Sequence, residues 1–190
     1  MTELLIPGAE VVLKEASGGE RKTSYDLIGV YQKDQKISLD SRVPNKLVWE
    51  TLKTGTLPEF HSYTSIRPEY SYSHTRFDFL LKNGAKPCLL EVKSCTLVKD
   101  GIAMFPDSES IRGRRHVKDL MRARYEGYRA CIIFIIQRID AHVFSPNDET
   151  DLEFGEVLRI AASKGVEIYS YLSEFVKDKI ILRRRVEVEL

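Results

Sequence analysis

Residues 76–93, RFDFLLKNGAKPCLLEVK, are the strongest indication of the fold in this chain. Two apolar runs, 77–81 and 89–92, flank Asn83-Gly84, and this dipeptide between such runs is the strongest short-range signal of a β-hairpin. The sequence therefore predicts two antiparallel strands in the middle of the chain, with charged residues placed among core-forming ones.

The charged residues of this hairpin can converge. A two-residue loop at Asn83-Gly84 places Asp78 opposite Leu89, and Glu91 then lies one diagonal step away on the same face, with Cβ atoms roughly 7 Å apart or less. Since side chains alternate along a strand, Lys93 points to the same side as Glu91. We expect Asp78, Glu91 and Lys93 to share one pocket.

Two neighbouring carboxylates make a seat for a hard divalent cation. Mg²⁺ is typically held by one or two carboxylates, waters and substrate phosphates, so Asp78 and Glu91 predict a Mg²⁺ site that could also take Mn²⁺. Lys93 beside them could polarise a water or face a phosphate oxygen. Glu50, on a helix predicted over 46–53 and capped by Asn45, could supply a third carboxylate. This layout is typical of a metal-dependent phosphodiesterase.

A simpler interpretation stays open for the same residues. An Asp on a sheet face is more often solvated or salt-bridged, and Arg76 would face Glu91 directly and could pair with it. Glu50 alone is an ordinary exposed helical residue. Charge placed amid core-forming strands nevertheless needs a reason, because burying it is costly.

Bulk properties narrow the class of protein. The 190 residues suit one sizeable domain with or without a small appendage, and a net charge of +1 excludes a global basic field. No apolar run is long enough to span a bilayer, and the first residues lack the pattern of a secretory signal. The three cysteines, each in or beside an apolar run, indicate buried reduced thiols. We expect a cytoplasmic protein without a membrane partner.

The rest of the chain alternates helices and strands. Short strands are predicted in the first forty residues, and 58–72 is irregular and aromatic, although its end could form a further strand before 76–81. Residues 99–110 are predicted to form a loop. Helices are expected over 111–127 and 152–163, and strands over 130–137, 141–144, 166–172 and 179–188. The fold class is therefore α/β with a mixed sheet.

A basic segment follows the hairpin. From residue 112 to residue 129 there are seven basic and two acidic residues, a local net charge of +5 in a nearly neutral chain. A solvated helix face is the simpler explanation. Arginines at a helix start, however, oppose the macrodipole and could assemble a phosphate receptor. The residues predicted to contact nucleic acid are Arg112, Arg114, Arg115, Lys118 and Arg122.

Several motifs together resemble the sugar fermentation stimulation protein family. They occur in order along nearly the whole chain: Pro44-Asn45-Lys46-Leu47-Val48, Thr75-Arg76-Phe77-Asp78-Phe79-Leu80-Leu81, Leu90-Glu91-Val92-Lys93-Ser94-Cys95-Thr96-Leu97, Phe105-Pro106-Asp107-Ser108, Arg112-Gly113-Arg114-Arg115-His116-Val117-Lys118-Asp119-Leu120, Gln137-Arg138 and Gly165-Val166-Glu167.

The resemblance implies an OB-like β subdomain over 1–43 and a domain similar to the PD-(D/E)XK nuclease fold over 44–190. By that likeness Asp78, Glu91 and Lys93 fall on the nuclease motif, and Glu50 falls on its acidic helix. The family is associated with non-sequence-specific DNA binding and a regulatory role in sugar (maltose) metabolism. The chain starts in what looks like the middle of the barrel, so either the start codon is set late or the barrel is incomplete.

Three functions are carried forward. The first is non-sequence-specific DNA binding through phosphate contacts, with a nuclease-like metal site. The second is active Mg²⁺-dependent hydrolysis of phosphodiesters, so that enzyme activity stays open. The third is a sugar-binding or regulatory protein without nucleic-acid contact, supported only by the aromatic residues between 61 and 72. Whether the chain forms a homo-oligomer is open as well.

Overall fold

A six-stranded mixed sheet forms the centre of the molecule. The computed structural model describes residues 3–16, 22–84 and 86–190. The strand order is β12-β11-β9-β6-β5-β4, with β6, β9 and β11 parallel and the others antiparallel to their neighbours. The strands are β4 (Ser65–Tyr72), β5 (Thr75–Lys82), β6 (Cys88–Cys95), β9 (Arg129–Ile136), β11 (Glu167–Val176) and β12 (Lys179–Arg185). The predicted α/β class with a mixed sheet is confirmed.

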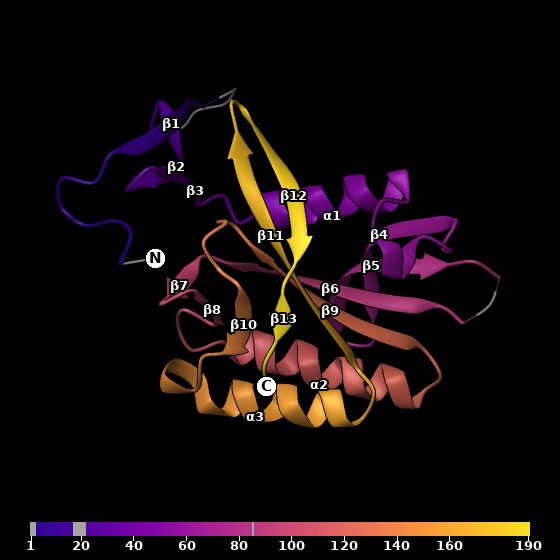
Figure 1. Cartoon of the computed structure of the whole chain (residues 1–190). Helices are drawn as coiled ribbons and strands as arrows, with labels where there is room; N and C mark the ends of the chain where they lie inside the picture. The colour runs from indigo at the N-terminus through magenta and orange to yellow at the C-terminus, as the bar shows by residue number, and fades with distance from the viewer. Residues whose placement is uncertain (1–2, 17–21, 85) are drawn as a thin grey trace.

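Helices cover both faces of this sheet, as Figure 1 shows. Helix α1 (Val43–Thr54) packs on one face, while α2 (Ile111–Tyr125) and α3 (Asp148–Ser163) pack on the other. Strand β9 lies between these layers, and every residue from 130 to 136 is buried. The apolar β-branched run predicted such a strand, because one that is covered on both faces has no polar side.

Two smaller sheets complete the fold. The first joins β1 (Val11–Glu15), β2 (Tyr25–Gln32) and β3 (Gln35–Ser38), and the second has the order β13-β10-β8-β7. The bounds of the second are β7 (Leu97–Lys99), β8 (Ile102–Phe105), β10 (Val143–Pro146) and β13 (Glu187–Val188), and a short 3-10 helix, η1, covers Pro58–Phe60.

The second sheet corrects two predictions. Residues 99–110 were predicted to be a loop but contain β8, which pairs in parallel with β10, about forty residues later. The strand predicted over 179–188 is divided: β12 pairs with β11, while β13 pairs with β10 in the other sheet. Both features depend on partners distant in sequence, which local patterns do not report.

The central hairpin forms, but its predicted register is wrong. Leu80 pairs with Leu89 and Leu81 pairs with Cys88, so the connection is longer than two residues. The predicted loop would have placed Pro87 opposite Leu80, inside the ladder, where proline has no N–H to donate. The pairing ends at Phe79 and Leu90, so Asp78 and Glu91 lie just beyond the last pair of the ladder.

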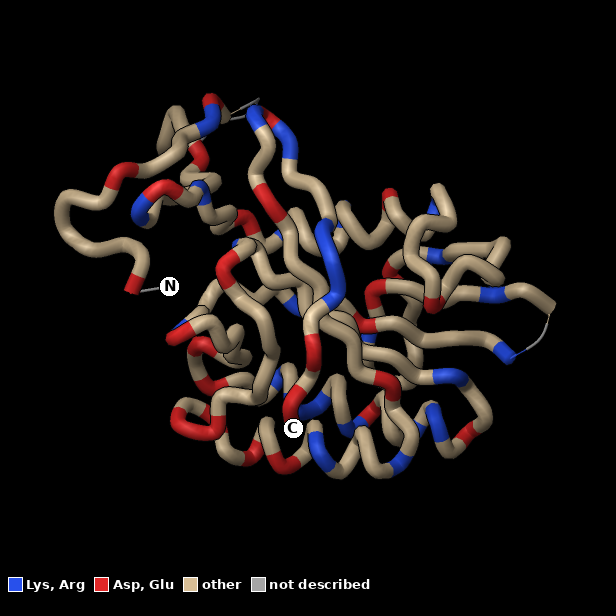
Figure 2. Tube along the Cα trace, viewed as in Figure 1, with Lys and Arg blue, Asp and Glu red and all other residues tan. Residues whose placement is uncertain are grey.

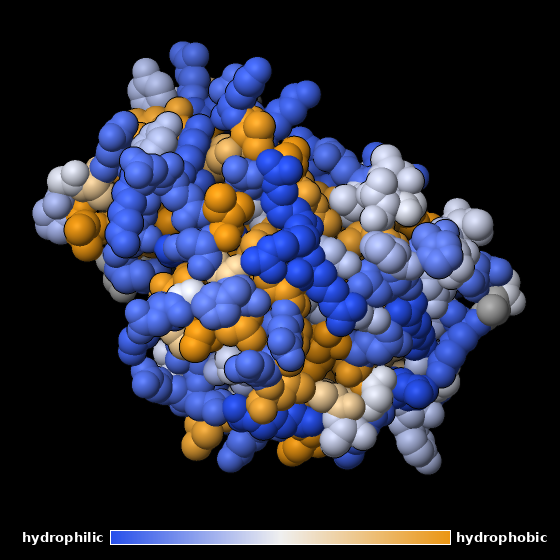
Figure 3. Space-filling view, in the orientation of Figure 1, coloured by the Kyte–Doolittle hydropathy of each residue, from blue (hydrophilic) through white to orange (hydrophobic). Residues whose placement is uncertain are grey.

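Apolar surface is distributed unevenly. The N-terminal sheet has a small core of Leu4, Val30, Ile37 and Leu39, and it leaves several apolar side chains of β1 and β2 exposed. A groove of about 610 Å³ lies between the end of α3 and the C-terminal strands. On the face drawn in Figure 3, hydrophobic residues also gather where the C-terminal strand crosses α3. In the part of the chain that the structure describes, no helix is long and apolar enough to cross a membrane.

Candidate metal and nucleic-acid site

Asp78 lies where β5 and β6 separate. Their pairing stops at Phe79 and Leu90, and beyond it the Asp78 carboxylate takes the place of a backbone partner. Its Oδ2 accepts the backbone N–H of Val92 at 2.7 Å, and its Oδ1 accepts Asn45 Nδ2 at 2.6 Å. Because strand N–H groups point along the plane of a sheet, the carboxylate occupies the opening between the two strands.

The environment of Asp78 disfavours its charge. Burial, assisted by the charge of Glu91, raises the pKa of Asp78 to about 6, although the Val92 N–H, Asn45 and Lys93 act in the opposite direction. A carboxyl of this kind binds a proton readily in the metal-free protein. A cation that entered the opening would favour the ionised form.

Glu91 is the most deeply buried charged residue of the site. Its side chain is 3% exposed, and its Oε1 accepts hydrogen bonds from Lys93 Nζ at 2.6 Å and from His116 Nδ1 at 2.5 Å. Its Oε2 is also buried and has no hydrogen-bond partner among the residues that the structure describes. Oε1 of this carboxylate therefore accepts two hydrogen bonds, while Oε2 accepts none from the described residues.

The two carboxylates are perturbed in opposite directions. Burial alone would raise the pKa of Glu91, but His116 and Lys93 outweigh it and lower the pKa below its ordinary value. Arg76, which could have paired with Glu91, instead forms an ion pair of 3.7 Å with Glu69. Glu91 thus stays ionised under conditions in which Asp78 takes up a proton.

Helix α1 contributes Asn45 to the site and not Glu50. The helix begins at Val43, earlier than predicted, and the Asn45 amide donates to Asp78 instead of capping the helix. Five residues further on, Glu50 is rotated by roughly 140° around the helix axis and is exposed. Among the described residues, Glu50 makes no hydrogen bond or ion pair with Asp78, Glu91 or Lys93.

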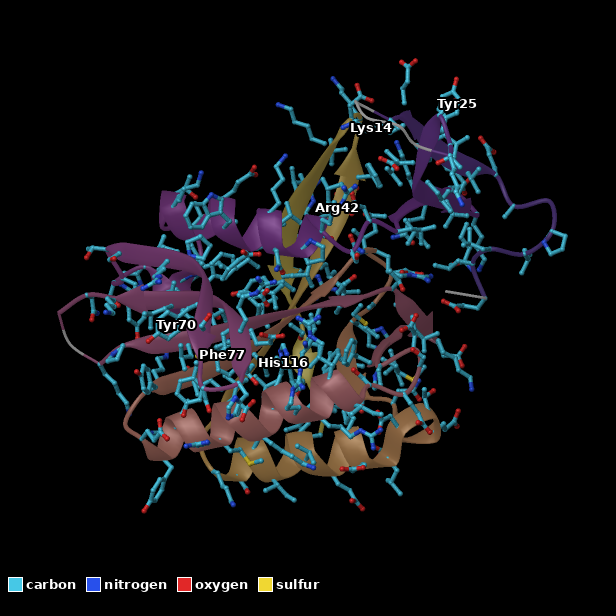
Figure 4. All side chains as sticks on the ribbon, turned by 180° about the vertical axis from the view of Figure 1, so that it is seen from behind. Lys14, Tyr25, Arg42, Tyr70, Phe77 and His116 are labelled. Atoms are coloured by element: carbon cyan, nitrogen blue, oxygen red, sulfur yellow. The ribbon has the colours of Figure 1, made fainter. Side chains whose placement is uncertain are left out.

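His116 is a site residue that the sequence analysis missed. It is buried on the side of α2 that faces the central sheet, as Figure 4 shows. No metal-ligand spacing marks this histidine, because its partner Glu91 lies on a strand. The available signal was the helical stripe Gly113, His116, Val117 and Leu120, which is buried throughout and carries one polar member.

The basic residues of α2 differ in how they are used. Ser110 caps the helix by accepting the backbone N–H of Gly113, as the predicted helix start at 111 requires. Arg114 hydrogen-bonds Glu153 of α3 and forms an ion pair with Asp151, and its side chain is only 16% exposed. Lys118 also binds Glu153, and Arg122 binds Glu126. Figure 2 shows positive and negative segments side by side along α2 and α3.

Two basic residues of α2 remain available. Arg112 is exposed and donates through Nε to His116 Nε2 at 3.3 Å. Arg115 is exposed, and no partner for it is found within the described ranges. A phosphate receptor at this helix start would therefore rest on Arg112 and Arg115, since Arg114, Lys118 and Arg122 already neutralise acids.

The donor set fits a divalent metal. In the described part of the chain no three His, Cys, Asp or Glu side chains group into a protein-only cage. Mg²⁺ does not require one, because two carboxylate oxygens, waters and phosphates suffice. The unpartnered Oε2 of Glu91 and the Asp78 carboxylate, whose pKa the Glu91 charge raises, can supply such oxygens. A hollow of about 260 Å³ follows directly along β6, lined in part by Ser94, Thr96 and Asp107.

Comparisons with known proteins give the family of this chain. The family model "Sugar fermentation stimulation protein RE domain" matches residues 42–179, and "SfsA N-terminal OB domain" matches residues 1–39. A sugar fermentation stimulation protein homolog of Thermoanaerobacter sp. (strain X514) is 44% identical over 99% of this chain and 82% of its own. The corresponding protein of Moorella thermoacetica is 49% identical over 90% of this chain and 75% of its own.

A solved structure shows the same fold. It is that of Pyrococcus furiosus SfsA in complex with Ca²⁺, with a TM-score of 0.91 and 31% identity, covering 99% of this chain and 81% of that one. This chain therefore belongs to the sugar fermentation stimulation protein family.

Proposed function

We propose that this protein binds DNA without sequence preference and holds a divalent metal ion between β5 and β6. The observation that carries the proposal is the buried Glu91 Oε2, which has no partner among the described residues and belongs to a carboxylate whose charge raises the pKa of Asp78. A buried, unpartnered charged oxygen is costly. A cation would remove that cost, which gives the arrangement a physical reason.

Each residue has a distinct task in this proposal. Asp78 and Glu91 would hold Mg²⁺ or Mn²⁺, and the Ca²⁺ complex of the Pyrococcus relative supports a divalent ion. Such an ion polarises a phosphoryl oxygen and acidifies a bound water. Lys93 is fixed by Glu91 at 2.6 Å, so its ammonium can face a phosphate next to the carboxylates.

DNA would approach along the start of α2. Arg112 and Arg115 are exposed there and can contact backbone phosphates, which carry no sequence information. The resulting affinity depends on salt and not on sequence. If the protein influences sugar (maltose) metabolism, DNA binding is the route that these residues offer.

Titration calorimetry with Mn²⁺ tests the metal site. We expect Glu91→Gln and Asp78→Asn each to weaken Mn²⁺ binding by at least about tenfold, because each removes a charged ligand. Glu50→Gln is the matched control, since it neutralises a carboxylate of the same domain that the structure leaves exposed. Equal affinity in the wild type, Glu91→Gln and Asp78→Asn would rule out this site.

Hydrolysis of the phosphodiester is a second candidate function. It is favoured by Lys93, whose position beside two carboxylates suits it to orient an attacking water or to stabilise charge on the phosphate. Purified protein would be incubated with Mg²⁺ or Mn²⁺ and with single-stranded DNA, double-stranded DNA and RNA. Cleavage that is lost in Lys93→Ala but kept in Lys118→Ala supports the role of Lys93, and cleavage that survives Lys93→Ala removes it.

A further inference from the structure

His116 connects the carboxylate pair to the basic helix. On one side its Nδ1 lies 2.5 Å from Glu91 Oε1, and on the other its Nε2 lies 3.3 Å from Arg112 Nε. The ring is 2% exposed and packs edge-on against Phe77, with ring centroids 6.1 Å apart. It is thus held between a candidate metal ligand and a candidate phosphate ligand.

The contacts determine which nitrogen carries the proton. A guanidinium nitrogen can only donate, so His116 Nε2 accepts the hydrogen bond from Arg112. Nδ1 then carries the hydrogen and donates it to the Glu91 carboxylate. The chain Arg112, His116, Glu91 is consequently directional, and each member fixes the orientation of the next.

The consequence for Glu91 is a fixed carboxylate. Both donors, Lys93 and His116, bind the same oxygen, Oε1. With Oε1 anchored twice, the carboxyl group cannot rotate without breaking a buried hydrogen bond from His116 and a partly buried one from Lys93. Oε2 therefore remains the oxygen presented to a ligand.

The consequence for Arg112 is a fixed guanidinium. An exposed arginine ordinarily samples many rotamers, and ordering it to grasp a phosphate costs entropy. Here Nε is held by His116, and within the described residues the two Nη groups have no partner. A fork held at Nε presents both Nη groups to a phosphate at a set place relative to Glu91.

We propose that His116 is a positioning residue that couples phosphate capture by Arg112 to metal binding by Glu91. The inference rests on the proposed metal site and assigns a task to a residue outside the two carboxylates and Lys93. It also names the recognised chemistry, a backbone phosphate adjacent to the metal-bound one. By linkage, each ligand strengthens the binding of the other through this chain of contacts.

A purely structural explanation makes different predictions. A histidine that only satisfied the core would affect folding stability, and its loss would alter metal and DNA affinity no more than any equally destabilising change. A positioning residue instead gives separable losses, because its two nitrogens serve two different partners. Substitutions that keep one nitrogen at a time can tell these explanations apart.

The experiment uses three variants of the full chain, checked by thermal melting, with two readouts. His116→Asn places an amide N–H near the Nδ1 position, so it keeps the donor to Glu91 and loses the acceptor for Arg112. His116→Gln places its amide near the Nε2 position, where its oxygen can accept from Arg112, and gives up the donor to Glu91. His116→Phe loses both. The readouts are Mn²⁺ affinity by calorimetry and affinity for a DNA duplex in EDTA.

We expect His116→Phe and His116→Gln to weaken Mn²⁺ binding by about 10- to 100-fold, the usual range for partners that orient a metal ligand. His116→Asn should stay close to wild type in this readout. In EDTA, His116→Asn should weaken DNA binding as Arg112→Ala does. The double variant that combines these two substitutions should bind DNA no more weakly than either single variant, because both substitutions remove the same contact, between Arg112 and His116. Arg115→Ala, the matched control, should add its loss to that of His116→Asn.

The possible outcomes separate failure of the coupling through His116 from failure of the metal site. If wild type binds Mn²⁺ but all three variants match it, the coupling is wrong while the metal site stands. If His116→Asn loses both readouts equally, the division between the two nitrogens is wrong. If wild type binds no Mn²⁺, the proposed metal site fails, and the DNA measurements in EDTA still accept or reject the link between His116 and Arg112.

Discussion

The β5–β6 hairpin and helix α2 both carry several charged residues, but the charge around Glu91 in the hairpin is buried and that on the helix is largely exposed. Glu91 is 3% exposed, and one of its oxygens accepts from the buried His116 and the partly buried Lys93, whereas Lys118 and Glu153 are both about half exposed. Buried charge is costly unless it is partnered, while an exposed ion pair gains little because water solvates both charges anyway. The strands therefore carry charge that needs a function, and much of the helix charge holds α2 to α3.

The largest expected effect is on the buried side of this comparison. Glu91→Ala leaves Lys93 and His116 without their shared acceptor, and breaking a buried ion pair typically costs about 3–5 kcal/mol. Urea denaturation in EDTA would measure it, with Glu153→Ala as the exposed control that changes the midpoint little. A Glu91→Ala protein that unfolds at the wild-type midpoint would erase the distinction between the two regions.

The next effect is on the pH dependence of the free energy of unfolding, to which Asp78 and Glu91 contribute with opposite signs. The folded pKa of Asp78 is raised to about 6 from 3.8, so the native state binds the extra proton, and the free energy of unfolding falls as pH rises through this window. The integrated change is about 3 kcal/mol, from roughly two pH units at 1.36 kcal/mol each. Glu91, whose pKa is lowered, contributes stability that is lost as pH falls below its ordinary value.

Urea denaturation in EDTA across pH 3–8 measures this window. Asp78→Asn should flatten the slope between pH 4 and 6 and should be more stable than wild type at pH 8. An unchanged slope in Asp78→Asn would mean that another group produces it. A wild-type protein that gains stability from pH 4 to 6 would contradict the sign.

A smaller effect is expected within the basic helix. Arg114→Ala removes the partner of Asp151, whose carboxylate also accepts the backbone N–H groups of Ser110 and Phe154. Losing this ion pair together with the charged hydrogen bond from Arg114 to Glu153 costs about 2 kcal/mol. Arg115→Ala is the matched control, because the neighbouring arginine is exposed. Equal stability of the two variants would show that Arg114 does not join α2 to α3.

The smallest effect on folding stability is expected for Arg115→Ala, which should have a clear effect on DNA affinity. Arg115→Ala should leave the melting temperature unchanged and lower the slope of log affinity against log salt by about 1, as expected for one phosphate contact. Fluorescence anisotropy with several unrelated duplexes at four salt concentrations checks it. A loss confined to one duplex would contradict the absence of sequence preference.

Local patterns predicted much of the fold correctly. The antiparallel pair of strands on either side of Asn83-Gly84, the buried run from 130 to 136 and the helix starting at Ile111 all appear in the structure. They succeed because each depends on residues close in sequence, whose periodicity and turn chemistry decide the element. The hairpin register failed for a local reason that was overlooked, since Pro87 does not suit the interior of a ladder.

The candidate site was predicted only in part. Lys93 binds Glu91, as strand alternation predicted, and the charges of both residues act on the pKa of Asp78, while their role as a metal site stays a prediction. Asn45 and His116 were missed and Glu50 was chosen instead, because which turn of a helix meets a strand depends on how the layers pack. The pairing of Arg114 and Lys118 with Glu153 has the same origin, since α3 lies more than thirty residues away.

Short-range periodicity predicted the hairpin, the buried central strand and the α/β class, and the cost of placing charge among apolar residues singled out the two carboxylates and their lysine. Packing between distant elements sets the rest: Asp78 opens the ladder, Glu91 is anchored through one oxygen only, and His116 lies between Glu91 and Arg112. Contacts between a helix and a strand depend on packing angle and depth, which residue spacing along the chain does not encode.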